Sequence, residues 1–282
     1  MAKIAVIGIC GNSVFLQADH FHEPGETLIA DAVFEEIGGK GINQAVAAAR
    51  MGAEVVFLAA IGDDKDGQRC AEVVREEGIR GCFCIKKGLR TTFAFILTDK
   101  NGENQVTGYH GAELCVEDVL AFEETLAQCD ILLLQQEVPE EVNEMAARLA
   151  EKHGVKVILN PAPIRDISEE IAKSVYLITP NEQEKQAIDT GRFRNVVTTL
   201  GKRGCLINEE EQIPAIAAQV VDTTGAGDTF NGVLAVCLAE GMELVSACKY
   251  AVAASGISVG RKGVLDAIPY REEIERRMRN VE

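Results

Sequence analysis

The sequence has little basic charge. It contains 28 Lys and Arg against 44 Asp and Glu, which gives a formal net charge of -16 at pH 7. Nucleic acids and anionic membranes both favour clustered Lys and Arg, so neither is expected to be the main partner. A nucleotide is still compatible with this charge, because a few backbone N–H groups suffice to bind its phosphates.

The nine cysteines lack the paired spacing of metal and redox motifs. No C-x-x-C occurs, and Cys82 and Cys84 form the closest pair. An odd count without such spacing predicts reduced thiols in a cytoplasmic protein. Metal ligation by these two cysteines is an alternative that lacks a second ligand pair. The apolar start, residues 1–10, is short and is followed by polar residues, so we expect a buried strand rather than an export signal or a membrane span.

No low-complexity tract or linker divides the 282 residues, which we expect to form a single domain, 1–282. Apolar runs of strand length alternate with amphipathic helix patterns. The strand patterns lie at 3–9, 53–62, 130–136, 155–163, 176–181 and 195–201. The helix patterns lie at 41–52, 66–79, 139–154, 166–175, 229–240, 244–259 and 271–279. This alternation predicts an α/β fold with a mostly parallel sheet between two layers of helices. Ligands of such sheets bind at the carboxyl ends of the strands.

Two segments break the alternation. Residues 91–111 form a hairpin pattern around the turn DKNGEN, and residues 20–39 form extended chain around Pro24 and Gly25. Together they predict a small β-sheet beside the main domain, built from segments of about 10–37 and 88–112. The sheet is either a pair of edge hairpins or a lid over a site.

Neither Gly-rich segment of the first 45 residues is a nucleotide-binding fingerprint. The stretch GICGNS lacks G-x-G-x-x-G, which argues against a dehydrogenase, and GGKGINQA has Gly41 where a P-loop needs Ser or Thr. The glycines of GGKGINQA nevertheless allow the backbone to approach a ligand closely. Lys40 and Asn43 are placed to reach hydroxyl groups, and a tight turn is the alternative.

Two later segments also follow strands. Asn181 and Glu184 in TPNEQE form N-x-x-E, an arrangement of oxygen ligands that suits Mg²⁺ directly or through water. Helix capping by Asn181 is the alternative. Residues 198–204 have the sequence TTLGKRG. Their backbone amides, with Lys202 or Arg203, are suited to hold polyphosphate, and a plain turn is the alternative.

The stretch DTTGAGDTF places an acid where a helix begins. Gly225, Ala226 and Gly227 lead into the helix, so their N–H groups are free to form an anion hole. Asp228 lies beside them and is placed to accept a proton from a substrate hydroxyl. That hydroxyl would then attack a phosphorus whose developing charge the N–H groups stabilise. This arrangement predicts phosphoryl transfer, with an N-cap Asp after a Gly turn as the alternative.

In their order and combination these motifs resemble the ribokinase-like family of carbohydrate kinases, also called the phosphofructokinase B family. The stretches GGKGINQAVAAARMGAEVVFLAAIGDDKDG and DTTGAGDTFNGVLA carry the resemblance. The shorter stretches LNPAP, TPNEQE, TLGKRG and GRKG occur in the family's order. The resemblance spans nearly the whole chain, and within the family it is strongest to the ribokinases, through GGKGINQA and NPAP.

The resemblance implies a three-layer α/β fold with a β-sheet lid that is shared across a homodimer. It implies ATP, Mg²⁺ and transfer of the γ-phosphate to a sugar hydroxymethyl group, with ribose or a related pentose as the substrate. It also implies an activating K⁺. A nucleoside kinase and a kinase of another substituted sugar are the nearest alternatives. A catalytically silent nucleotide- or sugar-binding regulator is an alternative of another class, against which the intact Asp228 argues.

The resemblance also assigns residues. Asp228 would be the general base, beside an anion hole formed by Gly225, Ala226 and Gly227. Sugar binding falls to Gly39, Lys40, Gly41, Asn43 and Glu137. Nucleotide binding falls to Asn181, Thr199, Gly201, Gly204 and Gly227, and Mg²⁺ falls to Asn181 and Glu184. The residues matched to K⁺, partly through backbone carbonyls, are Asp222, Thr224, Ser258, Arg261 and Gly263.

Three features depart from the family pattern. Gly11 and Ser13 stand where these kinases usually carry Asn and Asp to hold sugar hydroxyls, and Asn12 would substitute in part. Because charged hydrogen bonds contribute ~1.5–3 kcal/mol each, this change makes a deoxy, rearranged or substituted sugar an alternative to ribose itself. The segment between TPNEQE and TTLG is short, so we expect one side of the nucleotide site to be smaller than in the family. Ala267 replaces a hydroxyl beside the K⁺ site, which weakens the K⁺ expectation.

Overall fold

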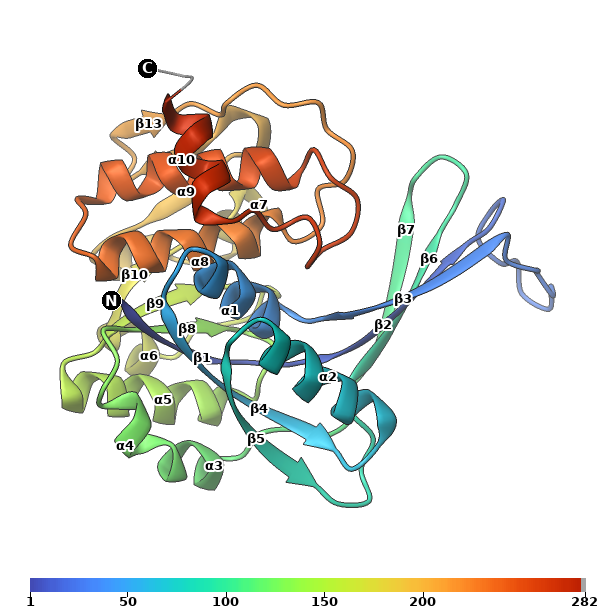
Figure 1. Cartoon of the computed structure of the whole chain (residues 1–282), viewed down its shortest axis with the longest axis horizontal. Coiled ribbons are helices and arrows are strands. Elements are labelled where there is room, and N and C mark those ends of the chain that lie inside the picture. Colours follow the sequence, from blue (N-terminus) through green and yellow to red (C-terminus); the bar gives the residue numbers. More distant parts are fainter. Residues whose placement is uncertain (280–282) are drawn as a thin grey trace.

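A parallel six-stranded sheet forms the centre of the computed structural model, which describes residues 1–279 (Figure 1). Every neighbouring pair in it runs parallel. In spatial order its strands are β10 (Val175–Ile178), β9 (Lys156–Asn160), β8 (Ile131–Gln135), β1 (Lys3–Ile7), β4 (Glu54–Gly62) and β5 (Arg80–Lys86). Residues 4–7 of β1 are fully buried, as a strand covered on both faces requires.

Two layers of helices cover this sheet. Because successive residues of a strand point to opposite faces, Ile4 and Val6 join one apolar cluster while Ala5 and Ile7 join the other. The first cluster contains residues of α1 (Lys40–Arg50), α2 (Lys65–Glu76), α8 (Ala226–Ala239), α9 (Leu244–Ser258) and α10 (Arg271–Arg279). The second contains residues of α3 (Val116–Ala121), α4 (Glu123–Leu126), α5 (Glu140–His153) and α6 (Glu169–Ser174). The predicted three-layer α/β fold is confirmed.

A second sheet projects from one side of this body (Figure 1). Its strand order is β3 (Ala32–Gly38), β2 (Gly11–Gln17), β6 (Phe93–Thr98) and β7 (Asn104–Tyr109). The predicted hairpin is present as the antiparallel pair β6–β7, and β2 pairs antiparallel with β3 but parallel with β6. The expected small β-sheet is therefore confirmed, and we call it the small sheet below.

The rest of the described chain lies on the side of β10. A three-stranded sheet contains β11 (Val197–Thr199), β12 (Cys205–Ile207) and β13 (Glu211–Ile213). Only the short helix α7 (Glu182–Ala187) and one 3-10 turn, Thr190–Arg192, separate β10 from β11, in line with the short segment noted in the sequence. Within residues 1–279, no helix is both long enough and apolar enough to cross a membrane.

The sequence reading missed β5, α3, α4, β12 and β13. Strand β5 has the sequence RGCFCIK and lies at the edge of the central sheet, where its residues are only partly covered. An edge strand does not need the continuous apolar run that identifies the buried strands, so its signal was weaker.

Helices α1 and α8 approach each other closely at Gly232. A Cβ atom at this position would lie 2.5 Å from the Cβ of Ala47 and 2.6 Å from the carbonyl oxygen of Gln44. Because Gly232 has no side chain, the backbone of α8 can contact Ala47 and the Gln44 carbonyl of α1 directly. This contact sets the distance between the residues that α1 and α8 carry at their N-terminal ends.

We predict that Gly232→Ala destabilises the protein. The added methyl group must displace α1 or α8, and overpacking of this kind costs ~1–3 kcal/mol, which exceeds the helix-propensity gain of about 1 kcal/mol. Calorimetry should show a melting temperature lowered by a few degrees. Gly256→Ala in α9 is the matched control: its new Cβ would meet no atom closer than 3.5 Å, so it should be neutral or stabilising. Equal melting temperatures for the two variants would contradict the close-contact account.

Candidate active site

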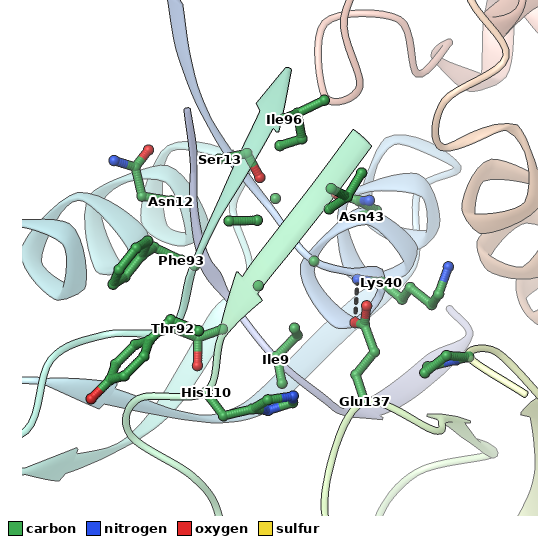
Figure 2. A pocket seen from close by; sticks show the side chains of 18 of the residues that line it. Ile9, Asn12, Ser13, Lys40, Asn43, Thr92, Phe93, Ile96, His110 and Glu137 are labelled. Carbon is green, nitrogen blue, oxygen red and sulfur yellow. Dashed lines mark hydrogen bonds between the residues drawn. The ribbon is translucent and has the colours of Figure 1, made fainter. Parts of the chain in front are cut away.

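A cavity of about 590 Å³ lies between the small sheet and the main body (Figure 2). Alternate residues of three small-sheet strands line it: Gly11, Ser13 and Phe15 of β2, Ala94 and Ile96 of β6, and Asn104, Val106 and Gly108 of β7. The main body contributes Gly39, Lys40, Asn43, Glu137, Thr224, Gly225 and Asp228. The small sheet therefore covers one side of a pocket at the carboxyl ends of the central strands, where such folds bind ligands.

Asp228 lies in this cavity and is 6% exposed. It occupies the first turn of α8, whose N-cap Gly225 has a positive φ of 73°. The first bond of the helical ladder runs from Thr229 N–H to the Gly225 carbonyl at 2.9 Å. The N–H groups of Gly227 and Asp228 precede this bond, as an anion hole requires. Of the three expected donors, Gly225, Ala226 and Gly227, Ala226 already uses its N–H: it donates to the Thr223 carbonyl at 3.3 Å, a long bond that leaves it only partly available.

Two amide side chains of α1 hold the Asp228 carboxylate. Asn43 Nδ2 donates to Oδ2 at 2.9 Å, and Gln44 Nε2 donates to Oδ1 at 3.1 Å. Gln44 is completely buried and also donates to Asn160 Oδ1 at 3.2 Å. Its own Oε1 accepts from Gln135 Nε2 at 2.8 Å. Both carboxylate oxygens are therefore fixed by a buried hydrogen-bond network.

The sequence reading singled out Asn43 but not Gln44. The available signal was a long polar side chain within the Ala-rich pattern of residues 41–52. A buried amide of this kind needs hydrogen-bond partners, because an unsatisfied one costs free energy. The partner of the Gln44 amide depends on how α8 packs against α1, which the sequence of α1 does not predict.

Lys40 faces several carboxylates. Its backbone N–H donates to Glu137 Oε2 at 2.8 Å, the bond drawn in Figure 2. Burial raises the pKa of Glu137 to about 7; the negative Asp228 adds to the rise, whereas Lys40 opposes it. Burial acts to lower the pKa of Lys40, but the charges of Asp228, Glu137 and Glu184 raise it overall. Three carboxylates around one ammonium group leave an excess of negative charge that suits a divalent cation.

Asn181 and Glu184 form a capping box at the start of α7. Asn181 Oδ1 accepts from the N–H groups of Gln183 and Glu184, and the Glu184 carboxylate accepts from Asn181 N–H and Nδ2 at 2.8 Å each. Burial raises the pKa of Glu184, and the nearby Asp228 charge adds to that rise. The capping geometry is thus present, and it fixes the carboxylate without using up its lone pairs.

Thr199 lies beside Asn181, since the two residues form an isolated parallel bridge. Gly201 and Gly204 follow it around the 3-10 turn Gly201–Arg203, with φ values of 53° and 90°. A Cβ at Gly204 would lie 1.9 Å from the Ile213 carbonyl oxygen, so this glycine is required by the approach of β13. The structure therefore brings Asn181 and Thr199 together but gives Gly204 a packing role of its own.

The two loops matched to K⁺ lie side by side. The N–H groups of Val221 and Asp222 both donate to the Val259 carbonyl, at 2.7 and 3.2 Å. Asp222 Oδ1 accepts from the backbone N–H and the hydroxyl of Thr224, at 2.9 and 2.7 Å.

Further along the second loop, Ser258 accepts Arg261 N–H at 3.0 Å, and the Arg261 guanidinium pairs with Glu273. Gly263 has a φ of 88°, and Ala267 is 1% exposed. The two loops are thus adjacent, with a buried methyl group where the family pattern has a hydroxyl.

The departures on β2 are built into the backbone. A Cβ at Gly11 would lie 2.2 Å from the Thr92 carbonyl oxygen, so no side chain fits there. Ser13 lies on the same face of β2 and lines the cavity. The Asn12 amide nitrogen is already engaged, since it donates to Glu35 Oε2 at 3.1 Å and to Asp66 Oδ1 at 3.3 Å. Its Oδ1 is buried and has no hydrogen-bond partner within residues 1–279, so Asn12 still offers an acceptor oxygen beside the cavity.

Comparison with known proteins gives consistent matches along the whole chain. A family model described as pfkB family carbohydrate kinase matches residues 1–271. A ribokinase of Haemophilus influenzae is 35% identical, with 96% of each chain covered. The crystal structure of a Thermotoga maritima ribokinase superposes with a TM-score of 0.91 at 35% identity, covering 99% of this chain and 100% of the other. A structure of Arabidopsis thaliana ribokinase complexed with ribose and ATP gives 0.89 at 27% identity, covering 99% of each chain.

We predict that Glu137→Gln stabilises the protein at high pH. Because the folded-state pKa of about 7 exceeds the ordinary value of 4.5, the folded protein binds this proton more tightly than the unfolded chain does. The wild-type protein should therefore lose stability as the pH rises from about 5 to about 7, and the glutamine variant should not show this loss. Calorimetry near pH 5 and near pH 8 should show the larger gain at pH 8. Glu141→Gln, an exposed change in α5, is the control; a gain of the same size at both pH values would refute the assignment.

Proposed function

The chain belongs to the pfkB family of carbohydrate kinases, and from this premise we propose that it transfers the γ-phosphate of ATP to the hydroxymethyl group of a sugar. Ribose or a related pentose is the proposed substrate class. The observation that carries the proposal is Asp228 in the first turn of α8. Its carboxylate accepts hydrogen bonds from the side-chain amides of Asn43 and Gln44 and faces the cavity. A carboxylate and free N–H groups at one point suit the transfer of a phosphoryl group to a hydroxyl.

In the proposed reaction Asp228 accepts the proton of the sugar hydroxyl. The hydroxyl oxygen forms a bond to the γ-phosphorus, the bond from this phosphorus to the β,γ-bridging oxygen breaks, and ADP leaves with that electron pair. The N–H groups at Gly225, Ala226 and Gly227 stabilise the charge that develops on the transferred group, with the positive end of the α8 dipole behind them. The amide of Ala226 contributes least, because Thr223 already accepts from it.

Sugar binding is assigned to the start of α1 and to Glu137. Asn43 donates to Asp228 through Nδ2, while its Oδ1 is buried and has no hydrogen-bond partner within residues 1–279. A sugar hydroxyl that donates to Oδ1 would remove this unfavourable state. Gly39 and Gly41 let the backbone approach the sugar, and Lys40 and Glu137 supply a donor and an acceptor. Ser13 supplies a hydroxyl from the small sheet.

The nucleotide and its ions are assigned to the neighbouring loops. Thr199, Gly201, Gly204 and Asn181 would line the ATP site, and Glu184 with Asn181 would hold Mg²⁺ through water. The divalent charge would neutralise part of the carboxylate excess around Lys40 and of the phosphate charge. A K⁺ ion is assigned to carbonyl and side-chain oxygens of Asp222, Thr224, Ser258, Arg261 and Gly263, with one ligand fewer because of Ala267.

We assign the small sheet two roles, as a lid and as the contact between two subunits of a homodimer. Its cavity face covers the sugar site. Its other face exposes two large apolar side chains, Val33 and Phe95, at 64% and 46%. Apolar side chains gathered on one sheet face favour burial against a partner.

We predict that Asp228→Asn abolishes turnover. The amide cannot accept the hydroxyl proton, and loss of a general base costs about 10²–10⁴-fold in rate. A coupled ADP-release assay should show kcat lowered by at least about 100-fold, with ATP binding by calorimetry retained. Asp99→Asn, at the exposed tip of the β6–β7 hairpin, is the control. Full activity of the Asp228→Asn variant would contradict the proposed mechanism.

We predict weak discrimination between ribose and 2-deoxyribose. The β2 residues that line the cavity are Gly11, Asn12, Ser13 and Phe15, so the sugar meets no carboxylate from this strand. The two values of kcat/KM should differ by less than about tenfold, whereas a charged hydrogen bond would add ~1.5–3 kcal/mol of discrimination. The same assay, run with ATP, Mg²⁺ and K⁺, should include fructose, substituted sugars and nucleosides.

A ribose preference above about 100-fold would contradict that prediction. Faster turnover of nucleosides would favour the nucleoside-kinase alternative instead. ATP binding without turnover of any compound would favour a silent nucleotide- or sugar-binding regulator.

A further inference from the structure

The loop after α9 is attached to the small sheet through strand β3. Glu36 Oε1 accepts hydrogen bonds from the backbone N–H groups of Val264 and Leu265, both at 2.8 Å. Two residues earlier on the same face of β3, the ring of Phe34 lies 5.2 Å from Lys262 Nζ. Residues 262–265 therefore contact β3 at two points, and the carboxylate is the contact with fixed hydrogen-bond geometry.

The same loop packs directly on the start of α8. A Cβ at Gly225 would lie 2.6 Å from Val264 Cγ1, so the two residues touch with no free space between them. Val264 is 7% exposed and lines the cavity together with Gly225. Gly225 is the N-cap of α8 and lies three positions before Asp228. A displacement of Val264 would therefore change the position of the N–H groups that precede Asp228.

The other end of the loop is fixed to the main body. Arg50 of α1 donates through Nη1 to the carbonyl oxygens of Leu265 and Ile268, at 2.7 and 2.8 Å. The loop thus lies between α1 and β3, and Glu36 accepts the hydrogen bonds that the loop donates to the small sheet. On the small sheet, Glu36 is the direct cross-strand partner of Ser13, which faces the sugar cavity.

We propose that Glu36 is a positioning residue that couples the seating of the small sheet over the cavity to the geometry of the α8 N-terminus. The route runs from the Glu36 carboxylate through the backbone of Val264 and Leu265, and from the Val264 side chain to Gly225. A sugar that draws Ser13 and β2 onto the cavity would thereby also set the N–H groups beside Asp228. The kinetic part of this inference rests on the proposed function, whereas the structural coupling does not.

Hydrogen–deuterium exchange of the full-length protein tests the coupling without any activity. Glu36→Ala should speed exchange in residues 262–266 and, through Val264, in residues 223–228, while the core of α9 remains protected. Glu36→Gln keeps an acceptor oxygen and should show a smaller effect in both segments. Glu103→Ala, which removes an exposed carboxylate at the tip of the same sheet, is the matched control. Native exchange of residues 223–228 in Glu36→Ala would overturn the proposal.

Kinetics with the best substrate then test the route. Glu36→Ala should lower kcat by about 10–100-fold, since small displacements of reacting groups have effects of this size, while KM for ATP changes less than about twofold. Val264→Ala keeps both backbone donors but removes the contact with Gly225. If the route is correct, the double variant Glu36→Ala with Val264→Ala should have the same kcat as Val264→Ala alone. Multiplicative effects on kcat, or a change confined to melting temperature, would overturn it. Should the protein turn over no sugar, the exchange experiment still decides the coupling, so failure of the proposed function is recognised separately.

Discussion

The close approach of α1 and α8 at Gly232 is the constraint on which the site depends. It lets Asn43 and Gln44 of α1 reach Asp228 in the first turn of α8, which lies 185 and 184 residues away from them in the sequence. A side chain at position 232 would separate the helices and lengthen both hydrogen bonds. Since interiors are packed to nearly crystalline density, a shift of one helix cannot be absorbed locally. The packing of the core therefore fixes the geometry of the candidate active site.

The electrostatics of the cavity oppose folding and favour binding. Asp228, Glu137 and Glu184 lie around Lys40 in a partly desolvated space, and burial raises the pKa of both glutamates. Keeping these groups charged at neutral pH destabilises the folded protein relative to a chain without them. In the proposed function the same unbalanced charge would favour a divalent cation, and Asn43 Oδ1, which has no partner within residues 1–279, would accept a hydroxyl. A site prepared for ligands is commonly less stable than an apolar equivalent.

The small sheet is where this chain differs from the pattern of its family. The Thr92 carbonyl approaches β2 so closely that position 11 admits no side chain, and the neighbouring Asn12 donates its amide nitrogen to Glu35 and Asp66. A side chain at position 11 would therefore require the Thr92 carbonyl to move. Glu36, across from Ser13, puts a carboxylate to another use, since it binds the loop that packs on Gly225. The proposed sugar contact at Ser13 and the contact with residues 264–265 at Glu36 thus lie on two adjacent strands.

The sequence by itself determined the layered α/β fold, the small sheet, the family and the identity of the proposed base. These follow from local signals, because apolar periodicity and Gly-rich turns before helices are read from neighbouring residues. Only the tertiary structure decided that Gln44 holds Asp228, that the Asn12 amide nitrogen binds Glu35, that the Ala226 amide is partly used, and that Glu36 binds the loop beside Gly225. Each of these contacts joins segments distant in the chain, or depends on the local path of a turn. Polar side chains choose partners by proximity after packing, which no local pattern encodes.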